Sequence, residues 1–121
     1  MWAALSGPQA CYAEASGDAA VYQSDISPFA ALADNGSPAA WRDLAKLTDY
    51  ALLTGPSVAP GPGWELAVSV PGVQMIGQSM TGVEDPEAVE LTETDVPEIL
   101  DLVERAKPGP FRKRTIALGR Y

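Results

Sequence analysis

The residue types needed for most acid–base and nucleophilic chemistry are absent or isolated in this sequence. Its 121 residues include no histidine and one cysteine, Cys11, which excludes Ser-His and Cys-His pairs and an ordinary zinc site. Without a basic partner, Cys11 is expected to be a small core residue. Acidic pairs such as Asp101 and Glu104 are expected on a solvated helix face. We therefore predict no catalytic residue and no metal site.

The clearest predicted element is a helix near the C-terminal end of the sequence. Apolar residues recur there at helical spacing, namely Val96, Ile99, Leu100 and Val103. This spacing predicts one apolar stripe on an amphipathic helix. Thr92 or Asp95 can cap its start, and we expect a loose turn at Thr92 with the helix proper from about Asp95. Pro97 suits the first turn, where its missing N–H costs little.

The residues around this helix predict a strand, a rigid loop and a second helix. Ala88 to Leu91 is expected to be the end of a strand. Pro108-Gly109-Pro110 should end the first helix, because the residue before a proline is pushed away from helical geometry. A shorter helix is expected from about Arg112 and should be closed by Gly119.

This pattern resembles the opening strand–helix–helix of the GNAT superfamily of N-acetyltransferases, in a bacterial branch with an additional N-terminal half. The resemblance is carried by Leu91–Asp95, Asp95–Glu104, Pro108-Gly109-Pro110-Phe111, Arg114-Thr115 and Leu118-Gly119, and upstream by Trp41, Leu44, Trp64-Glu65 and Pro71-Gly72-Val73-Gln74-Met75. It implies transfer of an acetyl group from acetyl-CoA to a primary amine. In that reaction a base deprotonates the amine and a backbone N–H polarises the thioester carbonyl.

The resemblance implies a substrate-binding loop in this chain. In GNAT enzymes the segment between the first two helices lines the amine-acceptor side of the cleft, and here that segment is Lys107 to Thr115. The substrate-binding residues that it implies are Pro108, Gly109, Pro110, Phe111, Arg114 and Thr115. Phe111 either presents an apolar wall to the acceptor or anchors the loop in the core.

Acetyl-CoA is the implied cofactor, yet we expect it not to bind this chain alone. The family binds the pyrophosphate on backbone N–H groups at a helix N-terminus, through Arg or Gln, two residues, Gly, one residue, and Gly or Ala. Gln74 to Ser79 is only superficially similar, because it ends in serine and precedes the expected opening strand. Gly55 to Gly63 is no phosphate cradle either, since its prolines remove backbone donors. In the family the acetyl-CoA site lies after the position of Tyr121.

We therefore expect the N-terminal segment of a GNAT-type N-acetyltransferase, inactive without the half that binds acetyl-CoA. Its expected partner is that missing half or a second copy of the chain. The alternative is a free-standing, non-catalytic interaction module on the same scaffold, with its acidic and basic segments as the partner surface.

The charge distribution restricts the partners and the compartment. A formal net charge of −8 argues against nucleic acid and against an anionic membrane surface. Charged residues are all acidic from Glu84 to Glu104 and all basic from Arg105 to Tyr121. These runs either form solvated surface and complement the helix C-terminus or, at Arg112 to Arg114, meet an acidic partner or anionic ligand. A single cysteine and no signal-peptide or membrane-spanning pattern predict a cytoplasmic protein.

The fold class predicted from these patterns is α+β or α/β, with a small mixed sheet, short helices and an incomplete GNAT-like fold. Residues 1–83 should form an N-terminal α/β region, and residues 84–121 the first strand and two helices of a GNAT-like core. Within the first region we expect a short helix between Pro8 and Gly17, a helix from Ser37 that places Trp41 in the core, strands at 19–23, 29–33, 50–54 and 64–70, and an extended stretch at 73–76.

Overall fold

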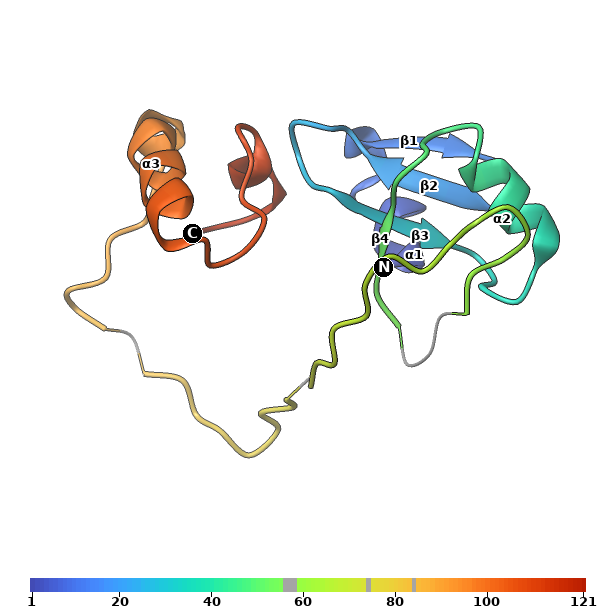
Figure 1. Ribbon diagram of the computed structural model, residues 1–121. Coiled ribbons are helices and arrows are strands. Elements are labelled where there is room, and N and C mark those ends of the chain that lie inside the picture. The colour runs from blue at the N-terminus through green and yellow to red at the C-terminus, as the bar shows by residue number, and fades with distance from the viewer. Residues whose placement is uncertain (56–58, 74, 84) are drawn as a thin grey trace.

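The computed structural model describes residues 1–55, 59–73, 75–83 and 85–121. Its helices are α1 (Trp2–Leu5), α2 (Pro38–Leu44) and α3 (Val96–Ala106), and its 3₁₀ helices are η1 (Ala10–Tyr12), η2 (Glu93–Asp95) and η3 (Thr115–Leu118). Its strands are β1 (Ala13–Ser16), β2 (Ala19–Tyr22), β3 (Phe29–Leu32) and β4 (Leu52–Leu53). A small mixed sheet with short helices confirms the α+β expectation (Figure 1).

The four strands form one sheet in the order β1-β2-β3-β4. The first three strands pair antiparallel, and β4 joins β3 in parallel. The turn between β1 and β2 requires glycine at position 17, because Gly17 has a φ of +51° and an added Cβ would lie 2.1 Å from Asp43 Oδ2. The predictions of strands at 19–23 and 29–33 are confirmed by β2 and β3.

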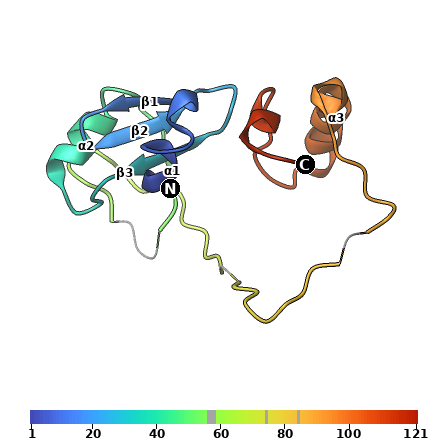
Figure 2. The ribbon, with the colours of Figure 1, turned by 180° about the vertical axis from the view of Figure 1, so that it is seen from behind.

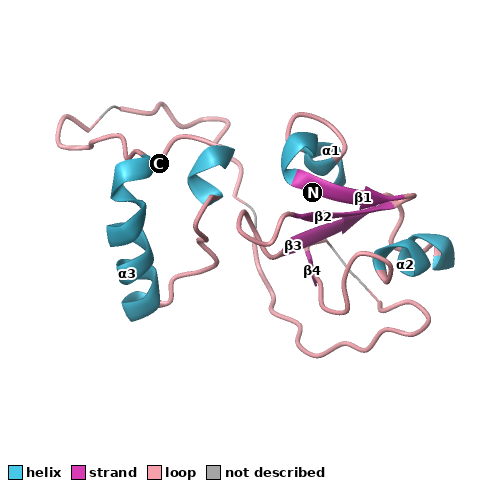
Figure 3. Cartoon of the chain, turned by 90° about the horizontal axis from the view of Figure 1, so that it is seen from above, coloured by secondary structure: helices cyan, strands magenta, loops and turns pink. Residues whose placement is uncertain are grey.

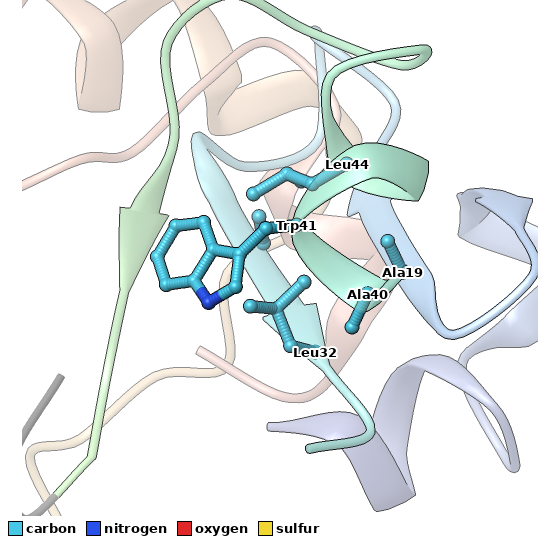
Figure 4. Close-up of a cluster of buried hydrophobic side chains, with 6 residues drawn as sticks. Ala19, Leu32, Ala40, Trp41 and Leu44 are labelled. Atoms are coloured by element: carbon cyan, nitrogen blue, oxygen red, sulfur yellow. The ribbon is translucent and has the colours of Figure 1, made fainter. Parts of the chain in front are cut away.

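Each face of the sheet has its own cluster of buried side chains, because successive strand residues point to opposite faces. The first cluster consists of Ala19, Ala30, Leu32, Ala40, Trp41 and Leu44. The second consists of Leu5, Ala20, Tyr22, Ile26 and Ala31. Helix α2 covers the first face (Figure 4). Helix α1 covers the second, and Leu118 of η3 packs beside it.

Helix α2 forms as its local sequence predicts. Ser37 caps its start by accepting a hydrogen bond from the Ala40 backbone N–H at 3.4 Å, and Pro38 occupies the first turn. Trp41 is 4% exposed, and its indole N–H donates to the Asn35 carbonyl at 2.7 Å. Trp41 is therefore a core residue, as expected, and its one polar atom has a partner.

The predicted helix between Pro8 and Gly17 is wrong. The chain forms η1 and then β1, whose residues pair with β2 through the turn at Gly17. Alanine is compatible with either conformation, so the backbone partner offered by β2 decides between them. Cys11 is exposed, which corrects its assignment to the core.

Two further predicted strands are wrong and one is shorter than expected. Residues 64–70 and 88–91, all of them described, form no strand. A strand needs a neighbouring strand that supplies a ladder of backbone hydrogen bonds, and among the described residues neither segment has one. The single bond from the Leu91 N–H to the Tyr121 carbonyl does not make a ladder. The strand predicted at 50–54 is reduced to the two half-buried residues of β4. The extended stretch at 73–76 includes Gln74, which lies outside the described residues.

The chain forms a sheet unit, residues 1–53, and a helical arm, residues 90–121 (Figures 1 and 2). The described residues between them form no helix or strand, and we call them the extended connection; Trp64 of this segment packs on the first cluster. Figure 3 shows the same arrangement from above, with a short helix of the arm between α3 and the sheet. The arm closes on itself. The Leu91 backbone N–H donates to the Tyr121 carbonyl at 2.8 Å, and Arg120 makes two hydrogen bonds to the Glu90 carboxylate at 2.9 and 2.7 Å.

Candidate functional site

The 3₁₀ helix η2, which leads directly into α3, begins with the Thr92–Asp95 capping box that the sequence predicts. The Asp95 carboxylate accepts hydrogen bonds from the Thr92 backbone N–H at 2.7 Å and from the Thr92 hydroxyl at 2.9 Å. These bonds lower the pKa of Asp95 below its ordinary value, the backbone bond having the larger effect. Pro97 lies in the first turn. The loose turn expected at Thr92 is the 3₁₀ helix η2.

The end of α3 turns the chain sharply into the Pro108-Gly109-Pro110 loop. Lys107 has left-handed geometry with φ +47°, and its backbone N–H donates to the Val103 carbonyl at 2.8 Å. A non-glycine residue rarely adopts this conformation, and here the proline that follows prevents the helix from continuing. The predicted helix end is confirmed. The loop therefore begins from a defined backbone direction.

The first four predicted site residues lie together on the exposed side of this loop. Pro108, Gly109, Pro110 and Phe111 line an open hollow of about 330 Å³ together with Val103 of α3. Phe111 is half-buried and packs edge-to-face on Tyr121, with ring centroids 5.4 Å apart and an interplanar angle of 87°. Phe111 thus meets the end of the arm and not either core cluster. It forms one wall of the hollow.

The other two predicted site residues attach the arm to the sheet unit. The Thr115 hydroxyl donates to the Ile26 carbonyl at 2.5 Å and accepts from the Arg112 backbone N–H at 2.7 Å. The Arg114 backbone N–H donates to the Asp25 carbonyl at 2.8 Å, and its guanidinium forms an ion pair with the Asp25 carboxylate at 3.1 Å. We call this set of bonds between residues 112–115 and 23–26 the docking contact. Arg114 therefore meets its acidic partner within the chain.

The second expected helix is shorter than predicted. It is the 3₁₀ helix η3, and Gly119 follows it as the C-terminal cap. Its first residue, Thr115, is 6% exposed, although threonine is a polar residue. The two hydrogen bonds of its hydroxyl, to the Ile26 carbonyl and from the Arg112 N–H, account for this burial, because a buried hydroxyl is stable only when it is bonded.

A second cavity, of about 250 Å³, lies on the sheet beyond the end of α2. One side of it is lined by three residues that are direct neighbours across β1, β2 and β3, namely Glu14, Val21 and Ala30. The remaining lining residues come from the end of β2, the turn that follows it, the start of β3, the loop after α2 and the arm: Tyr22, Ser24, Ser27, Pro28, Phe29, Leu47, Thr48, Tyr50 and Arg112. Sequence reasoning missed this cavity, because its walls come from segments that only the fold brings together.

Arg112 is the point at which the arm reaches this cavity. Its guanidinium donates to the Ser24 carbonyl, and the residue is half-buried. The basic run at Arg112 to Arg114 was the only sequence signal that pointed here. For this run the sequence predicted an acidic partner or an anionic ligand. Arg114 forms an ion pair with Asp25, whereas the ion pairs of the described residues include none with Arg112.

Two further observations concern metal binding and membrane spanning by the described residues. Among them, no group of three or more histidine, cysteine, aspartate or glutamate side chains is arranged to hold a metal ion. Within the same residues, none of the helices has the length and apolar character needed to cross a membrane.

Comparison with known proteins yields no match. No family model, no curated protein sequence and no solved structure is significantly similar to this chain.

Proposed function

We propose that this chain supplies the acceptor side of a GNAT-type N-acetyltransferase, with a further polypeptide segment contributing the acetyl-CoA site. The observation that carries the proposal is the geometry of the loop from Lys107 to Thr115. One end is fixed by the left-handed turn at Lys107, and the other by the docking contact. Between them, an apolar hollow faces outward. A loop fixed at both ends can position an amine with little loss of entropy.

The apolar surface left uncovered supports the need for a further segment. On α3, Leu102 is 54% exposed. Of the predicted stripe, Val96 is buried, whereas Ile99, Leu100 and Val103 are only half-buried. Exposed apolar surface of this kind marks a site where another polypeptide packs. We propose that the segment with the acetyl-CoA site packs against this helix, so that the hollow and the thioester share one cleft.

The first test is a calorimetric titration of acetyl-CoA into the chain alone. The proposal expects no binding at micromolar concentrations. Saturable binding in that range would contradict it, because the chain would then hold the cofactor by itself.

The second test reconstitutes activity with the polypeptide encoded directly downstream, if that polypeptide carries the Arg/Gln-x-x-Gly-x-Gly/Ala motif. Co-expression should give acetyl-CoA-dependent acetylation of a primary amine, measured as release of the CoA thiol. Phe111→Ala should raise the KM for the amine and leave the KM for acetyl-CoA unchanged. Leu66→Ala, on the extended connection, is the matched control. Equal effects of the two variants would place Phe111 outside the acceptor site.

A second candidate function, a non-catalytic interaction module, is favoured by the extended connection. Leu66, Val68 and Val70 alternate with polar or small residues and are 61, 62 and 81% exposed. An extended row of this kind is suited to pairing with the same row of a second copy of the chain. Sedimentation velocity should then show a dimer that Val68→Lys abolishes. A monomer at all concentrations would contradict this alternative.

A further inference from the structure

We propose that the cavity on the sheet beyond α2 binds a small zwitterion with an apolar body, of the chemical class of the free apolar amino acids. The geometry that points to it is a cavity whose lining combines apolar residues on the sheet with one acidic and one basic side chain, Glu14 and Arg112. The proposal goes beyond the proposed function, because the cavity is distinct from the hollow at Pro108–Phe111 and its occupancy requires no acetyl-CoA.

The floor of the cavity follows from the strand register. Val21 of β2 stands opposite Glu14 of β1 on one side and Ala30 of β3 on the other. These three side chains therefore share the sheet face that α2 covers farther along, at Ala19 and Leu32. Helix α2 ends at Leu44, so this end of the face is left to the loop that follows. Leu47 of that loop completes an apolar surface with Val21 and Ala30.

The charges at the cavity are opposite in sign and do not pair with each other. Among the described residues that line it, Glu14 and Arg112 are the charged ones. Among the ion pairs of the described residues, none includes either of them. Arg112 gives a hydrogen bond to the Ser24 carbonyl, which holds its guanidinium at the rim. A guanidinium has five N–H donors, so donors remain for a carboxylate.

The dimensions and polarity select the ligand class. A volume of about 250 Å³ is below the range of roughly 300–1,000 Å³ usual for drug-sized ligands. A molecule of amino-acid size fits that space. Its carboxylate would meet Arg112, its ammonium group would meet Glu14, and its aliphatic body would cover Val21, Ala30 and Leu47. Ser27, which is buried at the same rim, adds a hydroxyl to the polar side.

The test on the unaltered chain compares three probes that share one aliphatic body. L-Leucine carries both charges, 4-methylpentanoate only the carboxylate, and 3-methylbutylamine only the ammonium group. Titrations of the ¹⁵N-labelled chain should shift the amides of Glu14, Val21, Ala30 and Arg112. L-Leucine should bind at least about tenfold more tightly than either single-charge probe, a factor equivalent to 1.4 kcal/mol. Equal affinities of the three probes, or no leucine-dependent shift at these amides, would overturn the proposal.

Two variants assign the two ends of the ligand. Arg112→Gln should weaken L-leucine and 4-methylpentanoate about tenfold and leave 3-methylbutylamine unchanged. Glu14→Gln should weaken L-leucine and 3-methylbutylamine by a similar factor and leave 4-methylpentanoate unchanged. Arg42→Gln and Glu98→Gln are matched controls, because both residues are exposed and lie outside the cavity.

The variants also separate binding from folding. Arg112 contributes to the docking contact, so Arg112→Gln can detach the arm from the sheet unit. The amide spectrum of this variant would then show shifts throughout residues 112–118 and 23–26. Glu14 is exposed at the edge strand and its substitution leaves the docking contact intact. A Glu14→Gln chain that keeps a native spectrum and binds all three probes as the unaltered chain does would overturn the proposal.

Discussion

The sheet unit and the helical arm are stabilised in different ways. In the sheet unit, two clusters of buried side chains join α1, α2 and the strands across both faces of the sheet. In the arm, Val96 and Thr115 are the buried residues. Its fixed points are the capping box, the closure of Arg120 on Glu90 and the docking contact. The difference teaches that the sheet unit has a core of its own, whereas the arm is positioned by specific polar bonds together with the packing of Leu118 on the second cluster.

The largest effect expected from this comparison is a loss of core packing in the sheet unit. Trp41→Ala removes a ring that packs on Ala19, Leu32 and Leu44, and we expect it to cost about 3–5 kcal/mol of unfolding free energy. The matched change in the arm, Leu100→Ala at a half-buried position, should cost about 1 kcal/mol. Urea unfolding followed by circular dichroism measures both. Equal costs would show that the arm shares one core with the sheet.

A smaller effect is expected when the docking contact loses its buried hydroxyl. Thr115→Val keeps the shape of the side chain but leaves the Ile26 carbonyl and the Arg112 N–H without their bonds. The cost should be about 1–3 kcal/mol. Amide exchange should accelerate in η3 and remain slow in β2 and β3, because the sheet unit has its own core. Thr115→Ser, which keeps the hydroxyl, is the control. Equal acceleration in both units would mean that they unfold together.

The exposed part of the docking contact should contribute less. The side chains of Arg114 and Asp25 are 49% and 42% exposed, so solvent screens their attraction. A double-mutant cycle with Arg114→Gln and Asp25→Asn should give a coupling energy of about 0.5 kcal/mol. Raising the salt concentration should reduce this coupling further. A coupling energy as large as the cost of Thr115→Val would contradict our expectation that the Arg114–Asp25 ion pair stabilises the chain less than the Thr115 hydroxyl does.

Acid should weaken both units through one carboxyl in each. The hydrogen bond from Lys46, followed by that from the Asp18 backbone N–H, lowers the pKa of Asp43, while Thr92 lowers that of Asp95. Each carboxylate therefore stabilises the folded chain above its ordinary pKa of 3.8. This contribution is lost as the pH falls through the lower folded-state pKa.

Substitution of each carboxyl separates the two units in an acid titration. Asp43→Asn should flatten the acid-induced loss of stability in the sheet unit, and Asp95→Asn should do so in the arm. Amide signals of β2 and of α3, followed between neutral pH and pH values below 3.8, report on each unit. An acid profile unchanged by either substitution would show that these two groups do not set the acid stability.

Those elements whose signals are local were predicted from the sequence. The Ser37-Pro38 start of α2, the Thr92–Asp95 capping box and the end of α3 before Pro108 all depend on residues a few positions apart. Strands β2 and β3 were found from their apolar runs. The strand at 64–70 was predicted from alternation that is genuinely present in the sequence. It fails because alternation specifies two faces but not a pairing partner.

The candidate site shows the same limit at the level of residues. The break in the helix before the loop at Pro108–Phe111 was predictable, because proline restricts backbone geometry wherever it occurs. The role of Thr115 was not, since its partner Ile26 lies 89 residues away in the sequence. The cavity at Arg112 was not predictable either, because its lining residues lie as far apart in the sequence as Glu14 and Arg112.

By itself, the sequence determined a mixed class of helices and strands (α+β or α/β), the start of α2, the end of α3 and the acidic character of the chain. Only the tertiary structure decided that η1 and β1 replace the first predicted helix, that Arg114 binds Asp25, and that Glu14 and Arg112 line one cavity. The physical reason is range. Caps and prolines act within one turn of the backbone, whereas strand pairing, burial of a hydroxyl and assembly of a cavity require partners supplied by distant residues.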